Sequence, residues 1–116
     1  MRHKKNIRKF GRNKSHRRSL LRNMTISFFQ NKKVMTTEAK AKQLKRVVER
    51  LITAGKKQDL VSIRQINSYL NHPATTKIVM DLGKKFEGRK GGYTKIIKVD
   101  RRRGDASKMA IIQMVE

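Results

Sequence analysis

Residues 36–55 read TTEAKAKQLKRVVERLITAG, and this stretch carries the clearest helical pattern in the 116-residue chain. Its apolar side chains recur three and four residues apart, at Leu44, Val47, Val48, Leu51 and Ile52. Thr36 or Thr37 is suited to cap the first turn, where Glu38 favours the helix dipole, and Gly55 is a suitable end. The stretch therefore predicts an amphipathic helix that buries one face in a core.

A second helix is predicted on the N-terminal side of this stretch, beginning near Ser15. Asn13 or Ser15 can cap it, because both side chains accept hydrogen bonds from free backbone N–H groups. Its apolar face is predicted from the helical spacing of Leu20, Leu21, Met24 and Phe28. Between the two helices, a short strand is expected around Lys33–Met35.

Two further helices are predicted on the C-terminal side. Asp59 can cap the first of them, and Pro73 fits the first position of the second. The apolar stripe of the first comprises Leu60, Ile63, Ile66 and Leu70. The stripe of the second comprises Ile78, Val79, Leu82 and Phe86, and Gly83 interrupts it.

The last third of the chain reads as a glycine loop followed by two strands. Glycines occupy positions 88, 91 and 92, and β-branched or apolar residues then dominate 93–99 and 109–115. The segment DRRRGDASK at 100–108 joins them as a long basic hairpin loop. The predicted order is helix, strand, three helices and two strands, which indicates an α+β protein.

Positive charge is concentrated at the N-terminal end. The chain has 31 Lys and Arg against eight Asp and Glu, a formal net charge of +23. The first 22 residues contain ten of these bases and no acid. Residues 1–14 lack a regular apolar pattern, so we expect a basic N-terminal extension that is extended or disordered when free, followed by one globular domain over 15–116.

The sequence gives little support for an enzyme or a metal-binding protein. The eight acids are scattered, and Ser15 and His16 are adjacent, so on a helix they do not face each other. There is no cysteine, and His3, His16 and His72 are isolated. The sequence contains no run of 18 apolar residues, so we expect no membrane span. We therefore expect no catalytic site, cofactor, metal, small-molecule substrate or membrane partner.

Nucleic-acid binding is the function that the charge favours, because clustered Lys and Arg neutralise phosphates. Disordered basic arms that order on folded RNA favour RNA mildly over DNA. A DNA-compacting or regulatory protein remains the alternative, and an anionic membrane surface is a weaker one. The GRKGG loop at 88–92 has two interpretations that the sequence does not separate. It is either a plain turn or a place where the backbone comes close to a phosphate.

The chain also resembles a known family from end to end. The matching stretches are MRHKK, GRNKSHRRSLLRNM, TTEAKAKQLKRVVERLIT, RKGGYTKI and GDASKMAII, in the same order and spacing. They are similar to the L-seventeen family of bacterial large-subunit ribosomal proteins. The resemblance implies a two-layer fold of helices on a small mixed three-stranded sheet, with the short strand joining the C-terminal hairpin.

The same resemblance implies a function without catalysis or cofactor. The chain would be a structural constituent of the large ribosomal subunit in the cytoplasm, near the peptide exit tunnel, with ribosomal RNA and neighbouring ribosomal proteins as partners. Combined with the charge pattern, it predicts phosphate contacts by residues of the N-terminal arm, the first helix and two loops. These are Arg2, His3, Lys4, Lys5, Arg8, Lys9, Arg12, Asn13, Lys14, Ser15, His16, Arg17, Arg18, Arg22, Arg89, Lys90, Arg101, Arg102 and Arg103.

Overall fold

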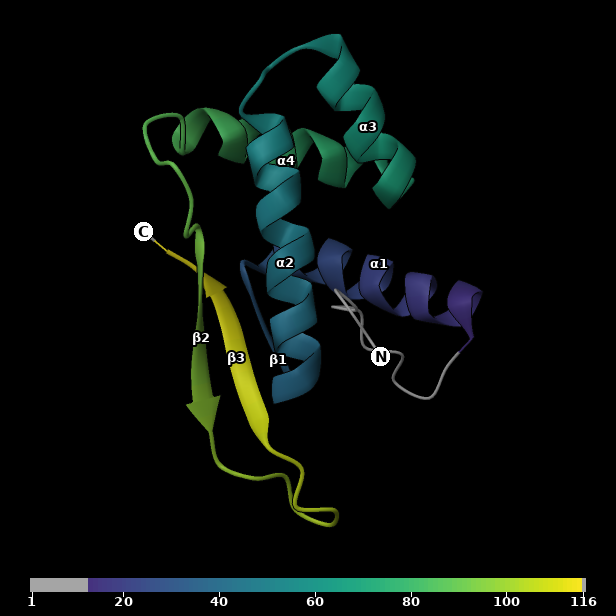
Figure 1. Ribbon diagram of the computed structural model, residues 1–116, viewed down its shortest axis with the longest axis vertical. Coiled ribbons are helices and arrows are strands. Elements are labelled where there is room, and N and C mark those ends of the chain that lie inside the picture. Colours follow the sequence, from purple (N-terminus) through teal and green to yellow (C-terminus); the bar gives the residue numbers. More distant parts are fainter. Residues whose placement is uncertain (1–12, 116) are drawn as a thin grey trace, which may run out of the picture.

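A computed structural model describes residues 13–115 of the chain, and these form four helices and three strands. In chain order they are α1 (Lys14–Asn31), β1 (Lys33–Thr37), α2 (Glu38–Gly55), α3 (Leu60–Leu70), α4 (Pro73–Lys85), β2 (Thr94–Val99) and β3 (Met109–Met114) (Figure 1). The α+β class and the predicted element order are confirmed. The first strand is longer than expected, since it runs on to the residue before α2.

The three strands form one sheet in the order β1-β3-β2, with both pairs antiparallel. The short first strand therefore does join the C-terminal hairpin, as expected. The expectation of a mixed sheet is wrong. The hairpin loop reverses the chain between β2 and β3, and β1 pairs with the other edge of β3 while running against it.

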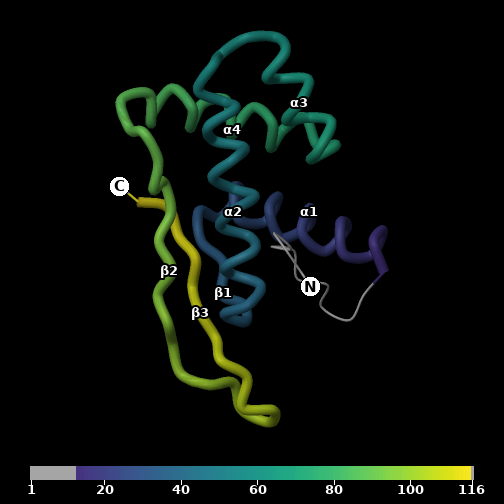
Figure 2. Tube along the Cα trace, in the orientation of Figure 1, coloured from purple at the N-terminus to yellow at the C-terminus, as the bar shows by residue number. Residues whose placement is uncertain are grey.

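Helix α2 occupies the centre of the helical layer. It runs along one face of the sheet (Figure 2) and packs against each of the other six elements. Its predicted stripe is confirmed, because Leu44, Val48, Leu51 and Ile52 are buried and Val47 is half-buried. The sheet and the helices thus form two layers, in which α1 and α2 pack against the strands and α3 and α4 pack against other helices.

The starts of the later helices follow the predicted local chemistry. The Asp59 carboxylate accepts a hydrogen bond from the backbone N–H of Ser62 at 2.7 Å, and Pro73 opens α4. Thr37 precedes α2 but makes no side-chain capping bond. The chain passes directly from β1 into α2 at this point, so Thr37 ends a strand as it begins a helix.

The buried face of α1 is turned relative to the predicted one. Phe28 is fully buried as expected, but Leu20 and Leu21 are only half-buried. Thr25 and Phe29 are fully buried beside Phe28. The core side of α1 therefore includes a threonine, whose hydroxyl is satisfied by a bond to the carbonyl of Leu21 at 2.6 Å.

The predicted stripe of α3 is only half correct. Ile66 and Leu70 are buried, but Leu60 and Ile63 are 59% and 39% exposed. Ser62 in the first turn of α3 is only 1% exposed, so the buried side of this turn is not the predicted apolar one. The apolar core residues that α3 supplies, Ile66 and Leu70, both lie in its second half.

The sheet face opposite the helices carries a row of aliphatic side chains. Met35, Ile111 and Ile97 are paired across the three strands. Met35 is 64% exposed and Ile97 is 42% exposed, so no part of residues 13–115 covers this row. The described domain thus has one open, partly apolar surface.

Two glycines let α2 and α4 meet backbone to backbone. A Cβ added at Gly83 would lie 2.5 Å from the carbonyl oxygen of Gly55 and 2.8 Å from the backbone nitrogen of Lys56. A Cβ at Gly55 would lie 2.9 Å from the carbonyl oxygen of Val79. Gly83 therefore does not interrupt α4 but continues it, and it allows a close contact between the two helices.

We predict that Gly83→Ala destabilises the domain. Overpacking costs about 1–3 kcal/mol, more than the helix-propensity gain of about 0.5–1 kcal/mol for replacing glycine. Urea denaturation followed by circular dichroism should show a lower midpoint. Gly88→Ala is the matched control, because a Cβ there would meet nothing within 4 Å. An equal or higher midpoint for Gly83→Ala would contradict the prediction.

Candidate nucleic-acid interface

The first turn of α1 presents a concentration of positive charge. Lys14, Ser15 and His16 are exposed, and the turn contains no acid. Asn13 caps it, because its side-chain oxygen accepts a hydrogen bond from the backbone N–H of His16 at 2.8 Å. The positive end of the helix dipole and its bases thus act together on the same surface.

The arginines farther along α1 differ in their surroundings. Arg18 is exposed, whereas Arg17 and Arg22 are half-buried. The Nε of Arg22 donates a hydrogen bond to the backbone carbonyl of Tyr69 at 3.0 Å. That carbonyl lies in the last turn of α3, where carbonyls lack partners within their own helix. Arg22 therefore joins α1 to α3 in addition to carrying charge.

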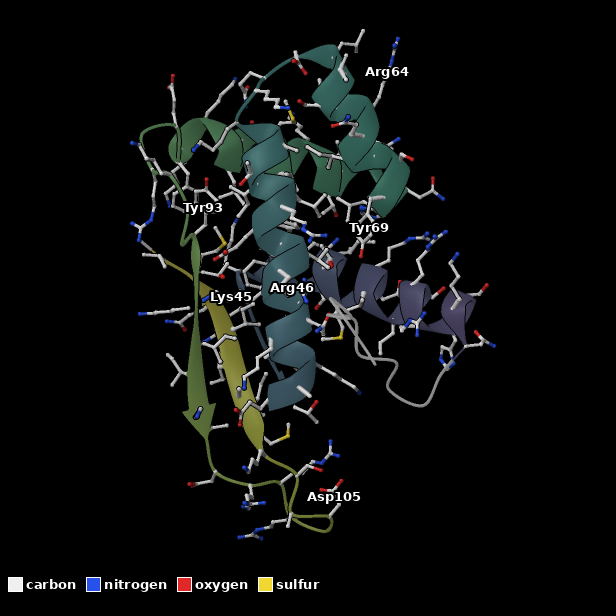
Figure 3. The ribbon with its side chains drawn as sticks, in the orientation of Figure 1. Lys45, Arg46, Arg64, Tyr69, Tyr93 and Asp105 are labelled. Carbon is white, nitrogen blue, oxygen red and sulfur yellow. The ribbon has the colours of Figure 1, made fainter. Side chains whose placement is uncertain are left out.

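Tyr69, labelled in Figure 3, lies where α1 meets the end of α3. Burial raises the pKa of its hydroxyl, while a hydrogen bond with Thr25 and the charges of Arg22 and Arg18 act in the opposite direction. The phenol therefore stays neutral near physiological pH. Arg18 and Arg22 therefore lie near a neutral tyrosine and not near a phenolate that would offset their charge.

The loop between α4 and β2 is held firmly at Arg89. Lys56 Nζ donates hydrogen bonds to the Arg89 carbonyl and to the Tyr93 hydroxyl, the latter at 3.1 Å. The Tyr93 hydroxyl also bonds to the Arg89 carbonyl at 3.3 Å, and Arg89 Nε donates to the Gly91 carbonyl at 3.1 Å. Lys90 is exposed and has no polar partner within residues 13–115. Arg89 thus braces the loop, while the charge of Lys90 is available.

The basic hairpin loop also uses its arginines in different ways. Arg102 forms an ion pair with Asp105, with 2.6 Å between Nη2 and Oδ2. Arg101 donates to the backbone carbonyl of Ala106 at 2.9 Å. Arg103 has no polar partner in the described part of the chain. It is the loop arginine whose charge is most available to a ligand.

The Arg102 hydrogen bond, with a backbone bond from Ser107, holds the pKa of Asp105 well below its usual range. Because the folded-state pKa is lowered, the pair is formed above the ordinary aspartate pKa of about 3.9 and is lost only as the pH falls through the lowered value. Asp105 therefore offsets Arg102 at every physiological pH.

The structure does not gather the predicted residues into one site. The start of α1, the loop after α4 and the hairpin loop lie at three separate ends of the domain (Figure 1). The predicted residues of the N-terminal arm lie outside the described range, namely Arg2, His3, Lys4, Lys5, Arg8, Lys9 and Arg12. A ligand that contacts all three regions must therefore extend across the domain.

Two bases were missed by the sequence reasoning. Arg46 and Arg50 lie on the exposed face of α2 and line a hollow shared with Lys90. Figure 3 labels Arg46 on α2 and Tyr93 just before β2, and both residues line this hollow. The sequence feature that could have identified Arg46 and Arg50 is their spacing of four residues, on the side of the helix opposite the apolar stripe.

Residues 13–115 contain neither a metal-ligand cluster nor a membrane-spanning helix. Within 13–115, no three His, Asp or Glu side chains are grouped to hold a metal ion. No helix in that range is long and apolar enough to cross a membrane. His72 is the N-cap of α4, where its Nδ1 accepts a hydrogen bond from the backbone N–H of Thr75 at 3.3 Å. This histidine has a structural role that sequence reasoning did not identify.

Comparison with known proteins identifies the family. The family model described as Ribosomal protein L17 matches residues 20–115. The chain belongs to the ribosomal protein L17 family. This membership confirms the resemblance found in the sequence.

Relatives in the L17 family match along almost the whole chain. A protein of Campylobacter jejuni subsp. doylei is 49% identical over 116 residues, covering 99% of each chain. Proteins of Nautilia profundicola and Natranaerobius thermophilus are 47% and 46% identical, covering 99% and 94% of this chain and 98% and 97% of their own. All three are named large ribosomal subunit protein bL17.

We predict that Arg22→Gln lowers the stability of the domain by about 1 kcal/mol, through loss of its bond to the Tyr69 carbonyl. Thermal unfolding followed by circular dichroism measures the change. Arg18→Gln is the control, since it removes the same charge from an exposed position and should shift stability by less than about 0.5 kcal/mol. Equal effects of the two substitutions would contradict the structural role of Arg22.

Proposed function

We propose that this chain is a structural, non-enzymatic component of the large ribosomal subunit and supports translation in the cytoplasm. The observation that carries the proposal is the similarity to large-subunit proteins over almost its entire length. In this role it binds large-subunit ribosomal RNA near the peptide exit tunnel, beside neighbouring ribosomal proteins.

The RNA contacts proposed here are made mainly to backbone phosphates. Phe28, Phe29, Phe86 and Tyr93 are buried, and Tyr69 is half-buried, so residues 13–115 present no open aromatic platform for stacking bases. Exposed cations lie at all three basic regions, among them Lys14, Lys90 and Arg103. Cations bind phosphates without regard to base identity. Recognition then follows the shape of folded RNA.

The N-terminal bases extend the same contact in this proposal. Residues 2–12 precede the first turn of α1, whose exposed bases and helix dipole favour anions. The globular domain serves as the anchor, and the arm runs from it among RNA segments. Arg103 and Lys90 supply contacts at the other two ends of the domain.

A competition binding experiment tests this function. The full chain should bind a structured fragment of large-subunit ribosomal RNA more tightly than duplex DNA of equal length at physiological salt. With six or more phosphate contacts, affinity should fall about 10³-fold or more between 50 and 200 mM salt. Equal or tighter binding to duplex DNA would instead favour the DNA-compacting alternative.

The loop arginines give a sharper prediction within the same assay. Arg103→Gln should weaken RNA binding and reduce the slope of log affinity against log salt by about 0.7–0.9, the value of one phosphate contact. The control is the double variant Arg102→Gln/Asp105→Asn, which removes the ion pair and leaves the net charge unchanged. Equal weakening by both variants would show that the loop acts through its shape and not through Arg103.

A further inference from the structure

A hollow of about 450 Å³ lies between α2 and the glycine loop that precedes β2. Arg46 and Arg50 line it from α2, and Lys90 and Gly91 line it from the loop. These groups come from segments some forty residues apart in the chain. Three cationic side chains therefore line one concave surface, which their positions in the sequence do not predict.

The loop side of this hollow is held in place from within. Lys56 Nζ bonds to the Arg89 carbonyl and the Tyr93 hydroxyl, and its charge lies 5.4 Å from the centre of the Tyr93 ring. The rings of Phe86 and Tyr93 pack with centres 5.3 Å apart. The backbone around Gly91 is thus positioned before any ligand arrives, which lowers the entropic cost of binding.

The charges that face the hollow favour an anion. Arg50 and Lys90 are exposed and have no polar partner among residues 13–115. Glu49 is the one acid that lines it, and its carboxylate accepts a hydrogen bond from the Thr94 hydroxyl at 3.0 Å. The cations outnumber this single carboxylate, and a guanidinium can hold two phosphate oxygens at once.

Gly91 has no explanation within the domain. A Cβ at this position would meet nothing within 4 Å, and its φ lies outside the left-handed region that favours glycine. Gly92, in contrast, has a φ of 64°. A glycine that neither packing nor backbone conformation requires suits a position where an external group comes close to the backbone.

We propose that this hollow binds a backbone phosphate of ribosomal RNA, held by Arg50 and Lys90 with Arg46 beside them and approaching the backbone at Gly91. The inference rests on the proposed RNA-binding function and adds a site on α2 to it. For the GRKGG loop at 88–92, it favours a close approach of the backbone to a phosphate over a plain turn. Arg89 then stabilises the loop through its bond to the Gly91 carbonyl.

The test measures binding of the full chain to a large-subunit ribosomal RNA fragment over a series of salt concentrations. Arg50→Gln should weaken binding about tenfold, and reduce the salt slope by about 0.7–0.9. Gly91→Ala should weaken binding with an unchanged unfolding temperature, because its methyl group takes the place of the phosphate. The matched controls are Arg64→Gln on the exposed side of α3 and Gly88→Ala, both outside the hollow and both expected to bind like the wild type.

The outcomes separate this site from the function on which it rests. If the wild type does not bind the RNA, the proposed function fails. If the wild type binds and either Arg50→Gln or Gly91→Ala binds equally well, the hollow is not a phosphate site and the function stands. Equal weakening by Arg64→Gln and Arg50→Gln would show a general effect of charge and would also overturn the site.

Discussion

The burial of one face of α2 is the interaction on which the rest of the domain depends. This helix packs against all three strands and all three other helices, and it supplies Leu44, Val48 and Ile52 to their common core. Its apolar stripe faces inward, which commits the opposite stripe to solvent. Arg46 and Arg50 lie on that outer stripe, so the same amphipathic pattern that builds the core also aims two cations outward.

Elements defined by local chemistry could be predicted from the sequence. The α2 stripe, the Asp59 cap, the Pro73 start and the strand-loop-strand ending depend on residues close in the chain, and each is confirmed. What failed depended on contacts between distant segments. The rotation of the buried face of α1, the exposure of Leu60 and the role of Gly83 depend on where other helices lie. The residue pattern within one helix does not contain that information.

The candidate interface shows the same division. Counting Lys and Arg correctly finds basic surface at α1 and at two loops, but it treats every base as equivalent. In the folded chain, Arg22, Arg89 and Arg102 bond to groups of the domain itself. The partner of Arg22 is Tyr69, which lies far away in the sequence, whereas Arg89 and Arg102 bond to the nearby residues Gly91 and Asp105. Lys90 and Arg103 have no such partners among residues 13–115. Formal charge therefore overstates the number of cations that a ligand can engage.

The uncovered aliphatic row on the sheet has a consequence for the protein when it is free. Met35 and Ile97 favour contact between copies, while a net charge of +23 keeps those copies apart. Added salt screens the repulsion without weakening the apolar attraction. The isolated chain should therefore become less soluble as ionic strength rises, so that concentrated, high-salt buffers promote self-association of a protein that dilute ones keep dispersed.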